Sequence, residues 1–228
     1  SGAYLVALDK RTGKERWKAD RGKGRSSYST PLIVPRPQGD ELIVNSTERI
    51  DAYDPGNGAL LWHTGEANRF PVPSPVFHDG VIYTSRGYRS GPYMAIRPGG
   101  RGDITRTHVL WTVPTGAPYV SSLLHYDGVI YMANDVGVLT AIDAAKGERL
   151  WQERVDGVFS ASPVAGGGQG RAQRLDEGGL ADAGDPGDAD PDGGRVHTDA
   201  VALRQRGQQL ARGRPVLGLG RLDQRDRL

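Results

Sequence analysis

The chain has 228 residues, a formal net charge of +2 and no cysteine. This length is enough for one domain, and the small net charge gives no support for nucleic-acid binding. The lack of cysteine excludes disulfides, thiolate metal sites and a cysteine nucleophile, and no apolar run reaches the roughly 18 residues of a transmembrane helix.

The chain starts with Ser1 rather than methionine and enters a repeated pattern within a few residues. We expect this start to be a cut end, with any signal peptide upstream of the sequence. The pattern is alanine, any residue, aspartate, three residues, glycine, three residues and tryptophan. Its copies span residues 7–17, 52–62 and 141–151, and a degenerate copy spans residues 95–111. In the degenerate copy Arg97 replaces the aspartate, and the loop is six residues longer.

Each copy of the pattern predicts a β-hairpin. Residues 139–142 are apolar and partly β-branched, as is typical of a short buried strand. Asp143 can accept hydrogen bonds from amides two or three residues further on, and Gly147 tolerates the positive φ that closes such a loop. A helix is disfavoured, because the glycine recurs and no 3.6-residue period is sustained.

The tryptophans of the four copies are expected to lie at equivalent buried positions, as packing wedges between neighbouring repeats. They are Trp17, Trp62, Trp111 and Trp151, at spacings of 45, 49 and 40 residues. A stacked aromatic site for a flat cofactor is the alternative. A period of about 40–50 residues indicates a propeller or a solenoid.

Two further landmarks repeat in phase with the tryptophans. Small residues and prolines recur at 29–31, 73–75, 121–123 and 161–163, and a turn followed by a strand recurs at 39–44, 79–83 and 127–131. One period therefore predicts four short strands, which fall at residues 74–78, 81–85, 93–96 and 109–113 in the second full repeat. The predicted fold class is all-β: a partial β-propeller of four-stranded antiparallel blades, about four blades' worth, with an irregular C-terminal tail. An open solenoid of hairpins is the alternative.

These landmarks resemble the pyrroloquinoline-quinone-type (PQQ-like) repeat β-propeller family over residues 3–168. The family includes quinoprotein dehydrogenases and non-catalytic propellers similar to the outer-membrane assembly lipoprotein. The resemblance implies a ring of six to eight blades, of which this chain supplies an arc with unpaired edges. It also implies a periplasmic or otherwise extracytoplasmic location.

The pattern stops within a repeat, so we divide the chain into a propeller segment, residues 1–168, and a tail, residues 169–228. The tail contains no Trp, Tyr, Phe, Ile, Met, Lys or Asn, and it is rich in Arg, Gly, Ala and Asp. We expect it to add no strand to the propeller and to result from out-of-frame translation of a GC-rich gene. A natural disordered tail is the alternative.

Three local motifs have simpler explanations than a functional site. The segment from Asp188 to Asp199 has the spacing of a calcium loop, but Arg195 stands where an apolar anchor is usual and no helices flank it. The adhesion-like triplet at residues 101–103 lies in the expanded hairpin loop of the degenerate copy, where turn chemistry explains it. His78 and His125 precede equivalent turns, where exposure is expected, and a two-histidine metal site would require both at one rim.

The sequence thus predicts no catalytic, cofactor-binding or metal-binding residue. Quinone-dependent dehydrogenation in the family relies on a catalytic aspartate, calcium ligands, a coplanar tryptophan and, in many members, adjacent cysteines. Here cysteine is absent, and Asp9, Asp54 and Asp143 are assigned to turns. We predict a non-catalytic scaffold of the bacterial cell envelope that binds protein partners through its blade loops or rim. A fragment of a quinoprotein dehydrogenase and a sugar- or ligand-binding propeller are the alternatives.

Overall fold

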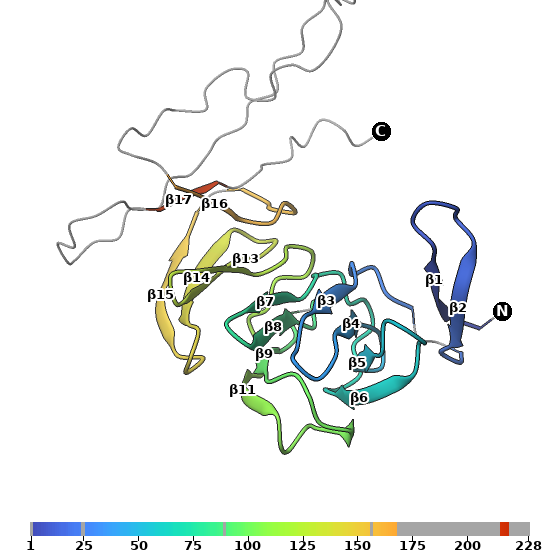
Figure 1. The fold of residues 1–228 in the computed structure, drawn as a ribbon. Helices are drawn as coiled ribbons and strands as arrows, with labels where there is room; N and C mark the ends of the chain where they lie inside the picture. The colour runs from blue at the N-terminus through green and yellow to red at the C-terminus, as the bar shows by residue number, and fades with distance from the viewer. Residues whose placement is uncertain (1, 24–25, 89, 156, 168–214, 219–228) are drawn as a thin grey trace, which may run out of the picture.

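The computed structural model describes residues 2–23, 26–88, 90–155, 157–167 and 215–218. In these ranges the regular secondary structure consists of β-strands alone (Figure 1). Within the same ranges no helix is long and apolar enough to cross a membrane. The predicted all-β class is therefore confirmed, and so are the four-stranded antiparallel sheets.

The strands form five sheets, numbered here in chain order. The first contains β1 (Tyr4–Leu8) and β2 (Glu15–Asp20). The second contains β3 (Leu32–Val34), β4 (Glu41–Asn45), β5 (Ile50–Tyr53) and β6 (Leu60–Thr64), extended by β10 (Gly102–Asp103). The third contains β7 (Val76–His78), β8 (Val81–Ser85), β9 (Tyr93–Ile96) and β11 (Val109–Val113). The fourth contains β12 (Leu124–Tyr126), β13 (Val129–Ala133), β14 (Val138–Asp143) and β15 (Arg149–Arg154).

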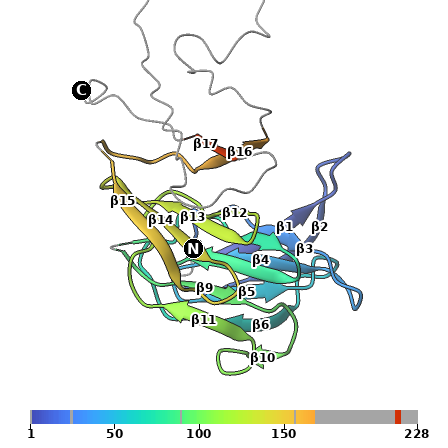
Figure 2. The same ribbon diagram turned by 90° about the vertical axis from the view of Figure 1, so that its left-hand side faces the viewer.

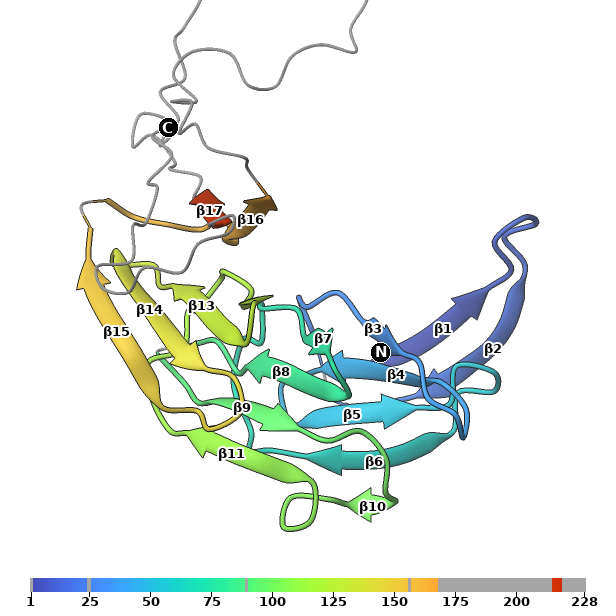
Figure 3. The ribbon, with the colours of Figure 1, turned by 60° about the vertical axis from the view of Figure 1, so that its left-hand side comes forward.

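The fifth sheet pairs β16 (Val164–Gly167) antiparallel with β17 (Pro215–Gly218). The strand β17 lies in the tail, from which no strand was expected, so that expectation is corrected for residues 215–218. The sheets from β1–β2 to β12–β15 follow one another in an arc (Figure 3). The pair β16–β17 lies beside the fourth sheet, where β16 contacts β12 (Figure 2).

The hairpin pattern forms as predicted. Each tryptophan is the cross-strand partner of the alanine of its own copy, in the pairs Ala7–Trp17, Ala52–Trp62, Ala95–Trp111 and Ala141–Trp151. The glycines that close the three regular loops have positive φ, with φ of 70° at Gly13, 76° at Gly58 and 73° at Gly147. The aspartate Oδ1 accepts the predicted turn hydrogen bonds, for example from the amides of Ala145 and Lys146 to Asp143 at 2.9 Å.

Where the hairpin loop of the next sheet is regular, the tryptophan packs onto its loop glycine. A Cβ placed on Gly58 would lie 2.5 Å from the indole of Trp17, whose Nε1 donates to the carbonyl of Pro55 at 2.9 Å. Trp111 lies in the same way against Gly147 and donates to the carbonyl of Ala144 at 3.0 Å. The expected wedge between neighbouring repeats is therefore a specific contact of an indole with a glycine and a carbonyl.

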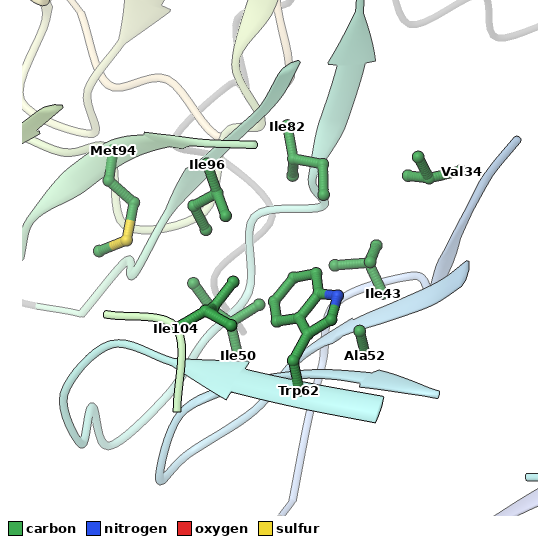
Figure 4. Close-up of a cluster of buried hydrophobic side chains, with 9 residues drawn as sticks. All are labelled: Val34, Ile43, Ile50, Ala52, Trp62, Ile82, Met94, Ile96 and Ile104. Carbon is green, nitrogen blue, oxygen red and sulfur yellow. The ribbon is translucent and has the colours of Figure 1, made fainter. Parts of the chain in front are cut away.

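Trp62 differs from the other three because the expanded loop of the next repeat folds over it. In this loop β10 pairs parallel with β6, and Ile104 enters the core between the second and third sheets. Trp62 is fully buried there (Figure 4), whereas the other three indoles are half-buried, which corrects the expectation of uniform burial. The core around it is formed by the residues labelled in Figure 4, namely Val34, Ile43, Ile50, Ala52, Ile82, Met94, Ile96 and Ile104.

The small-residue landmarks join the sheets at their first strands. The amide of Thr30 donates to Oγ of Ser74, that of Ser74 to Ser122, and that of Ser122 to Ser162, each at 3.0 Å. The sequence identified these positions as strand starts. The structure adds that each hydroxyl binds the amide of the preceding repeat.

Candidate functional site

The two ends of each sheet carry different connections. In the four-stranded antiparallel sheets, the loops between strands one and two and between strands three and four lie at one end, the hairpin end. The loops between strands two and three and the connections to the next sheet lie at the opposite end, the loop end. Contacts between neighbouring sheets join hairpin end to hairpin end and loop end to loop end, so these ends coincide across the arc.

The loop end carries a continuous row of aromatic rings, which we call the aromatic row: Tyr28, Phe70, Tyr88 and Tyr119. Successive ring centroids lie 6.2, 5.1 and 5.5 Å apart, and the last two pairs are edge-to-face. Tyr28 is 64% exposed, whereas the other three rings are half-buried. The row therefore joins four loops into one partly exposed apolar surface.

Close backbone packing brings these loops together. Gly87, next to Tyr88, has a φ of 76°. A Cβ there would lie 3.1 Å from the carbonyl oxygen of Phe70 and 3.0 Å from that of Tyr119. A side chain at this position would push the loops apart, so glycine is needed both for its backbone conformation and for space.

Buried Arg86 fixes the loop that carries Tyr88. Its Nη2 donates to the carbonyls of Glu66 at 2.7 Å and Ser46 at 2.8 Å, and its Nη1 donates to Asn45. Burial lowers the pKa of Arg86 to about 10, so its guanidinium stays charged at neutral pH. These bonds connect the third sheet to two loops of the second and hold the aromatic row in place.

A second buried charge cluster joins the first sheet to the second. Asp51 is fully buried and accepts from Arg49 at 2.6 Å and from Arg21 at 3.3 Å. The hydroxyl of Tyr53 donates to the same carboxylate at 3.3 Å, and burial raises the pKa of this tyrosine. The cluster lies at the loop end, where Arg21 follows the last strand of the first sheet.

The sequence did not identify the aromatic row or Arg86. The available signal was an aromatic residue shortly before the small-residue landmark. It comes two residues before Thr30, four before Ser74 and three before Ser122. Because this offset varies, a search for positions in strict phase does not find it.

The histidine pair lies at the hairpin end. The rings of His78 and His125 stack with centroids 3.8 Å apart, so the two residues do meet at one rim. His78 is exposed, as expected, whereas His125 is half-buried against Tyr83, which corrects its expected exposure. In the part of the chain that the structure describes, no three His, Asp or Glu side chains gather so that they could hold a metal ion.

The remaining motifs are placed as follows. Arg101 is exposed, and the next two residues of its triplet form β10. The Oδ1 of Asp103 accepts the amide of Thr105 at 2.9 Å, so the acid serves a turn. The calcium-like segment from Asp188 to Asp199 lies outside the described residues.

The residues described here do not fit a bound quinone. Three indoles, those of Trp17, Trp62 and Trp111, are held by contacts with neighbouring sheets. The aspartates of the repeat accept turn hydrogen bonds, and cysteine is absent from the sequence. No step of quinone chemistry can be assigned to these side chains.

Two curated proteins share sequence similarity with the chain. The outer membrane protein assembly factor BamB of Alkalilimnicola ehrlichii is 40% identical over 70 residues, which cover 28% of this chain and 18% of that protein. The serine/threonine-protein kinase AfsK of Streptomyces griseus is 25% identical over 162 residues, which cover 71% of this chain and 15% of the kinase. The chain thus spans less than a fifth of the length of either relative.

Solved structures share the fold. BamB from Moraxella catarrhalis superposes with a TM-score of 0.53 and 22% identity, covering 70% of this chain and 49% of that one. A europium-containing methanol dehydrogenase superposes with a TM-score of 0.56 and 12% identity, covering 72% and 42%. At these identities the likeness shows the propeller fold alone.

The profile of one protein family matches most of the chain. It is the family described as outer membrane protein assembly factor BamB, and its matches span residues 1–99 and 46–210. The in-phase repeats, the four-stranded sheets and the superposition on a BamB structure agree with this match. The chain therefore belongs to the BamB family of PQQ-like repeat propellers.

Proposed function

We propose that this chain is a non-catalytic scaffold of the bacterial cell envelope that binds a protein partner at its loop end. Membership of the BamB family supports the class, and the aromatic row supports the place. The envelope location and the absence of catalysis are parts of this proposal. The family and the side chains available support both.

The aromatic row is the observation that carries the proposal. Tyrosine and phenylalanine are enriched at the centres of protein interfaces, where they contribute large contact areas at low cost in conformational entropy. Three of the four rings are carried by loops that pack around Arg86 and Gly87, and the amide of Tyr28 donates to the carbonyl of Pro71 at 3.2 Å. Exposed Arg69, whose guanidinium lies 5.9 Å from the ring centroid of Phe70, adds a cation at the margin. A preorganised surface of this kind loses little freedom on binding.

The geometry of the row favours a protein over a flat small ligand. A sugar or quinone is usually held between or upon parallel faces, but the Phe70–Tyr88 and Tyr88–Tyr119 pairs are edge-to-face, at 84° and 67°. In each of these pairs the edge of one ring covers the face of the other, and a flat ligand would need that face for stacking. A partner that lies across the row can instead contact the outer surfaces of all four rings.

Site-specific photo-crosslinking tests the proposal. A photoreactive phenylalanine analogue at Tyr28 is expected to capture a defined protein in envelope fractions of the organism that encodes the chain. The same probe at exposed Lys146, on the hairpin end, should capture none. Adding Phe70→Ala and Tyr88→Ala to the Tyr28 probe should abolish the adduct while the fold persists. Equal labelling at both ends, or an adduct that survives both substitutions, contradicts the proposal.

The alternative of a quinoprotein dehydrogenase has a separate test. Titration with pyrroloquinoline quinone and calcium should give no saturable quenching of tryptophan fluorescence. Saturable quenching together with alcohol- or sugar-dependent dye reduction would overturn the scaffold function.

A further inference from the structure

The histidine pair joins the third sheet to the fourth at positions where neighbouring repeats carry apolar side chains. His125 is the middle residue of the first strand of its sheet, and Phe77 and Ile33 hold this position in the third and second sheets. His78 is the last residue of such a strand, and Val34 holds that position in the second sheet. Both histidines therefore depart from the side-chain type of the repeat.

The preceding junction shows what the repeat uses instead. Val34 of the second sheet is fully buried, and Phe77 of the third sheet packs against the same apolar cluster. His78 and His125 correspond to these two residues, and their rings stack with centroids 3.8 Å apart and planes 23° from parallel. An apolar pair would satisfy the packing here too. What the histidines add to this junction is a dependence on protons.

The surroundings of the two rings differ. His78 is exposed, and its Nε2 lies 3.2 Å from Oδ2 of Asp79, so a proton on this ring has a carboxylate beside it. His125 is half-buried and also stacks on Tyr83, whose pKa burial raises, so that its hydroxyl is neutral in this range. Burial, and then the charge of His78, lowers the pKa of His125, against the opposing charges of Asp79 and Asp127. The first proton therefore belongs on His78.

The stack tolerates one proton but not two. With His78 protonated, a cation lies against the face of a neutral aromatic ring, which is a favourable arrangement. With His125 protonated as well, two like charges stand 3.8 Å apart. Groups that interact so closely titrate as a pair, and the second proton binds at a lower pH than the first. The second protonation therefore acts against the contact itself.

Other contacts decide which part of the junction responds. At the hairpin end, beside the histidines, the indole Nε1 of Trp111 donates across the junction to the carbonyl of Ala144 at 3.0 Å. At the loop end, the rings of Tyr88 and Tyr119 hold the same two sheets together at 5.5 Å. Repulsion between the histidines therefore acts on the hairpin end and leaves the loop-end contact in place.

We propose that His78 and His125 form a pH-sensitive switch, which opens the hairpin end of the junction between the third and fourth sheets when both rings are protonated. At neutral pH the rings are stacked and the junction is closed. As the pH falls below about 6.5, the ordinary range of histidine, the second proton separates the rings. The loop end acts as the hinge of this movement, and the strands within each sheet keep their pairing.

NMR spectroscopy of the wild-type chain tests the switch. The two rings should titrate in coupled steps separated by about one pH unit or more. After the second step, the indole N–H of Trp111 should exchange with solvent about tenfold faster than that of Trp17 at the same pH. The indole of Trp17 is the internal reference, because it donates to the carbonyl of Pro55 at the junction of the first and second sheets, away from the histidines. Comparison at equal pH removes the chemical effect of pH on exchange.

The double variant His78→Val, His125→Phe gives this junction the side-chain types of the preceding one. It should fold, as checked by circular dichroism, and its ratio of Trp111 to Trp17 exchange should not change with pH. His63→Gln is the control, since it removes a histidine of the second sheet and should leave the switch intact. Independent titration of the two rings, an unchanged Trp111 indole in acid, or the same acid response in the double variant overturns the proposal.

Discussion

The indole Nε1 of Trp62 donates a 2.8 Å hydrogen bond to the buried carboxylate of Glu41. Where the next loop is regular, the tryptophan donates instead to a backbone carbonyl of that loop, as Trp17 and Trp111 do. The next loop here is the expanded one, and Glu41 supplies the acceptor. The same carboxylate accepts the amide of Gly99 at 3.2 Å and pairs with Arg36. One acid thus compensates for the irregular repeat.

Glu41→Ala is therefore expected to lower the free energy of unfolding by about 3 kcal/mol, because it leaves buried donors without an acceptor. Urea unfolding followed by circular dichroism measures the change. Exposed Glu148→Ala is the control and should stay within about 0.5 kcal/mol of the wild type. A loss below about 1 kcal/mol at Glu41 would show that water replaces the carboxylate.

Gly147→Ala should destabilise the chain more than Gly128→Ala. Both glycines have a φ of 73°, so the backbone strain is matched. Only at Gly147 would the new Cβ meet an indole, 2.7 Å from Cδ2 of Trp111. We expect an additional loss of about 1–3 kcal/mol from this overpacking, measured by urea unfolding. Equal losses in the two variants would show that Trp111 moves aside freely.

His125 should make stability depend on pH. Burial, and then the charge of His78, lowers the pKa of His125, although Asp79 and Asp127 oppose the shift. The folded pKa is below the unfolded value of about 6.5, so the unfolded chain binds more protons between the two pKa values. Stability should therefore fall as the pH decreases below about 6.5, with no contribution from His125 well above it. Melting temperatures across this range for the wild type and His125→Phe measure the effect; parallel curves would exclude it.

Truncation after Gly168 tests the role of the tail. It removes β17, which pairs with β16 over four residues, but leaves the second, third and fourth sheets intact. We expect the melting temperature to change by no more than a few degrees. A larger decrease would show that the tail packs on the propeller. Sequencing of the gene past this point tests the out-of-frame hypothesis directly.

The sequence predicted what depends on local chemistry within one repeat. The pairing of alanine with tryptophan and the positive φ of Gly13 follow from a pattern that recurs position for position. Burial of Trp62 could not be predicted, because it depends on the fold of an irregular loop and on Glu41, which stands 21 residues away. The stacking of His78 on His125 depends on contact between neighbouring sheets, and their offsets from the turns differ by one residue.

The aromatic row was missed for a related reason. Its members come from connections of different length, so tertiary packing rather than a fixed period aligns them. Tyr88 lies in the loop between β8 and β9, within one sheet, whereas the other three lie in connections between sheets. Surfaces formed by several loops are therefore the part of this fold that a single sequence describes least.

The amides of Thr30, Ser74 and Ser122 each donate to the serine hydroxyl of the next repeat, so the same kind of donor and acceptor is used at every step. If a gene gains or loses one whole repeat, every remaining amide still faces a hydroxyl. A gain or loss of part of a repeat instead leaves an amide without its hydroxyl partner. Blade number can therefore change during evolution in whole steps without loss of contact between neighbours, as in other repeat proteins whose stability is a sum of nearest-neighbour terms.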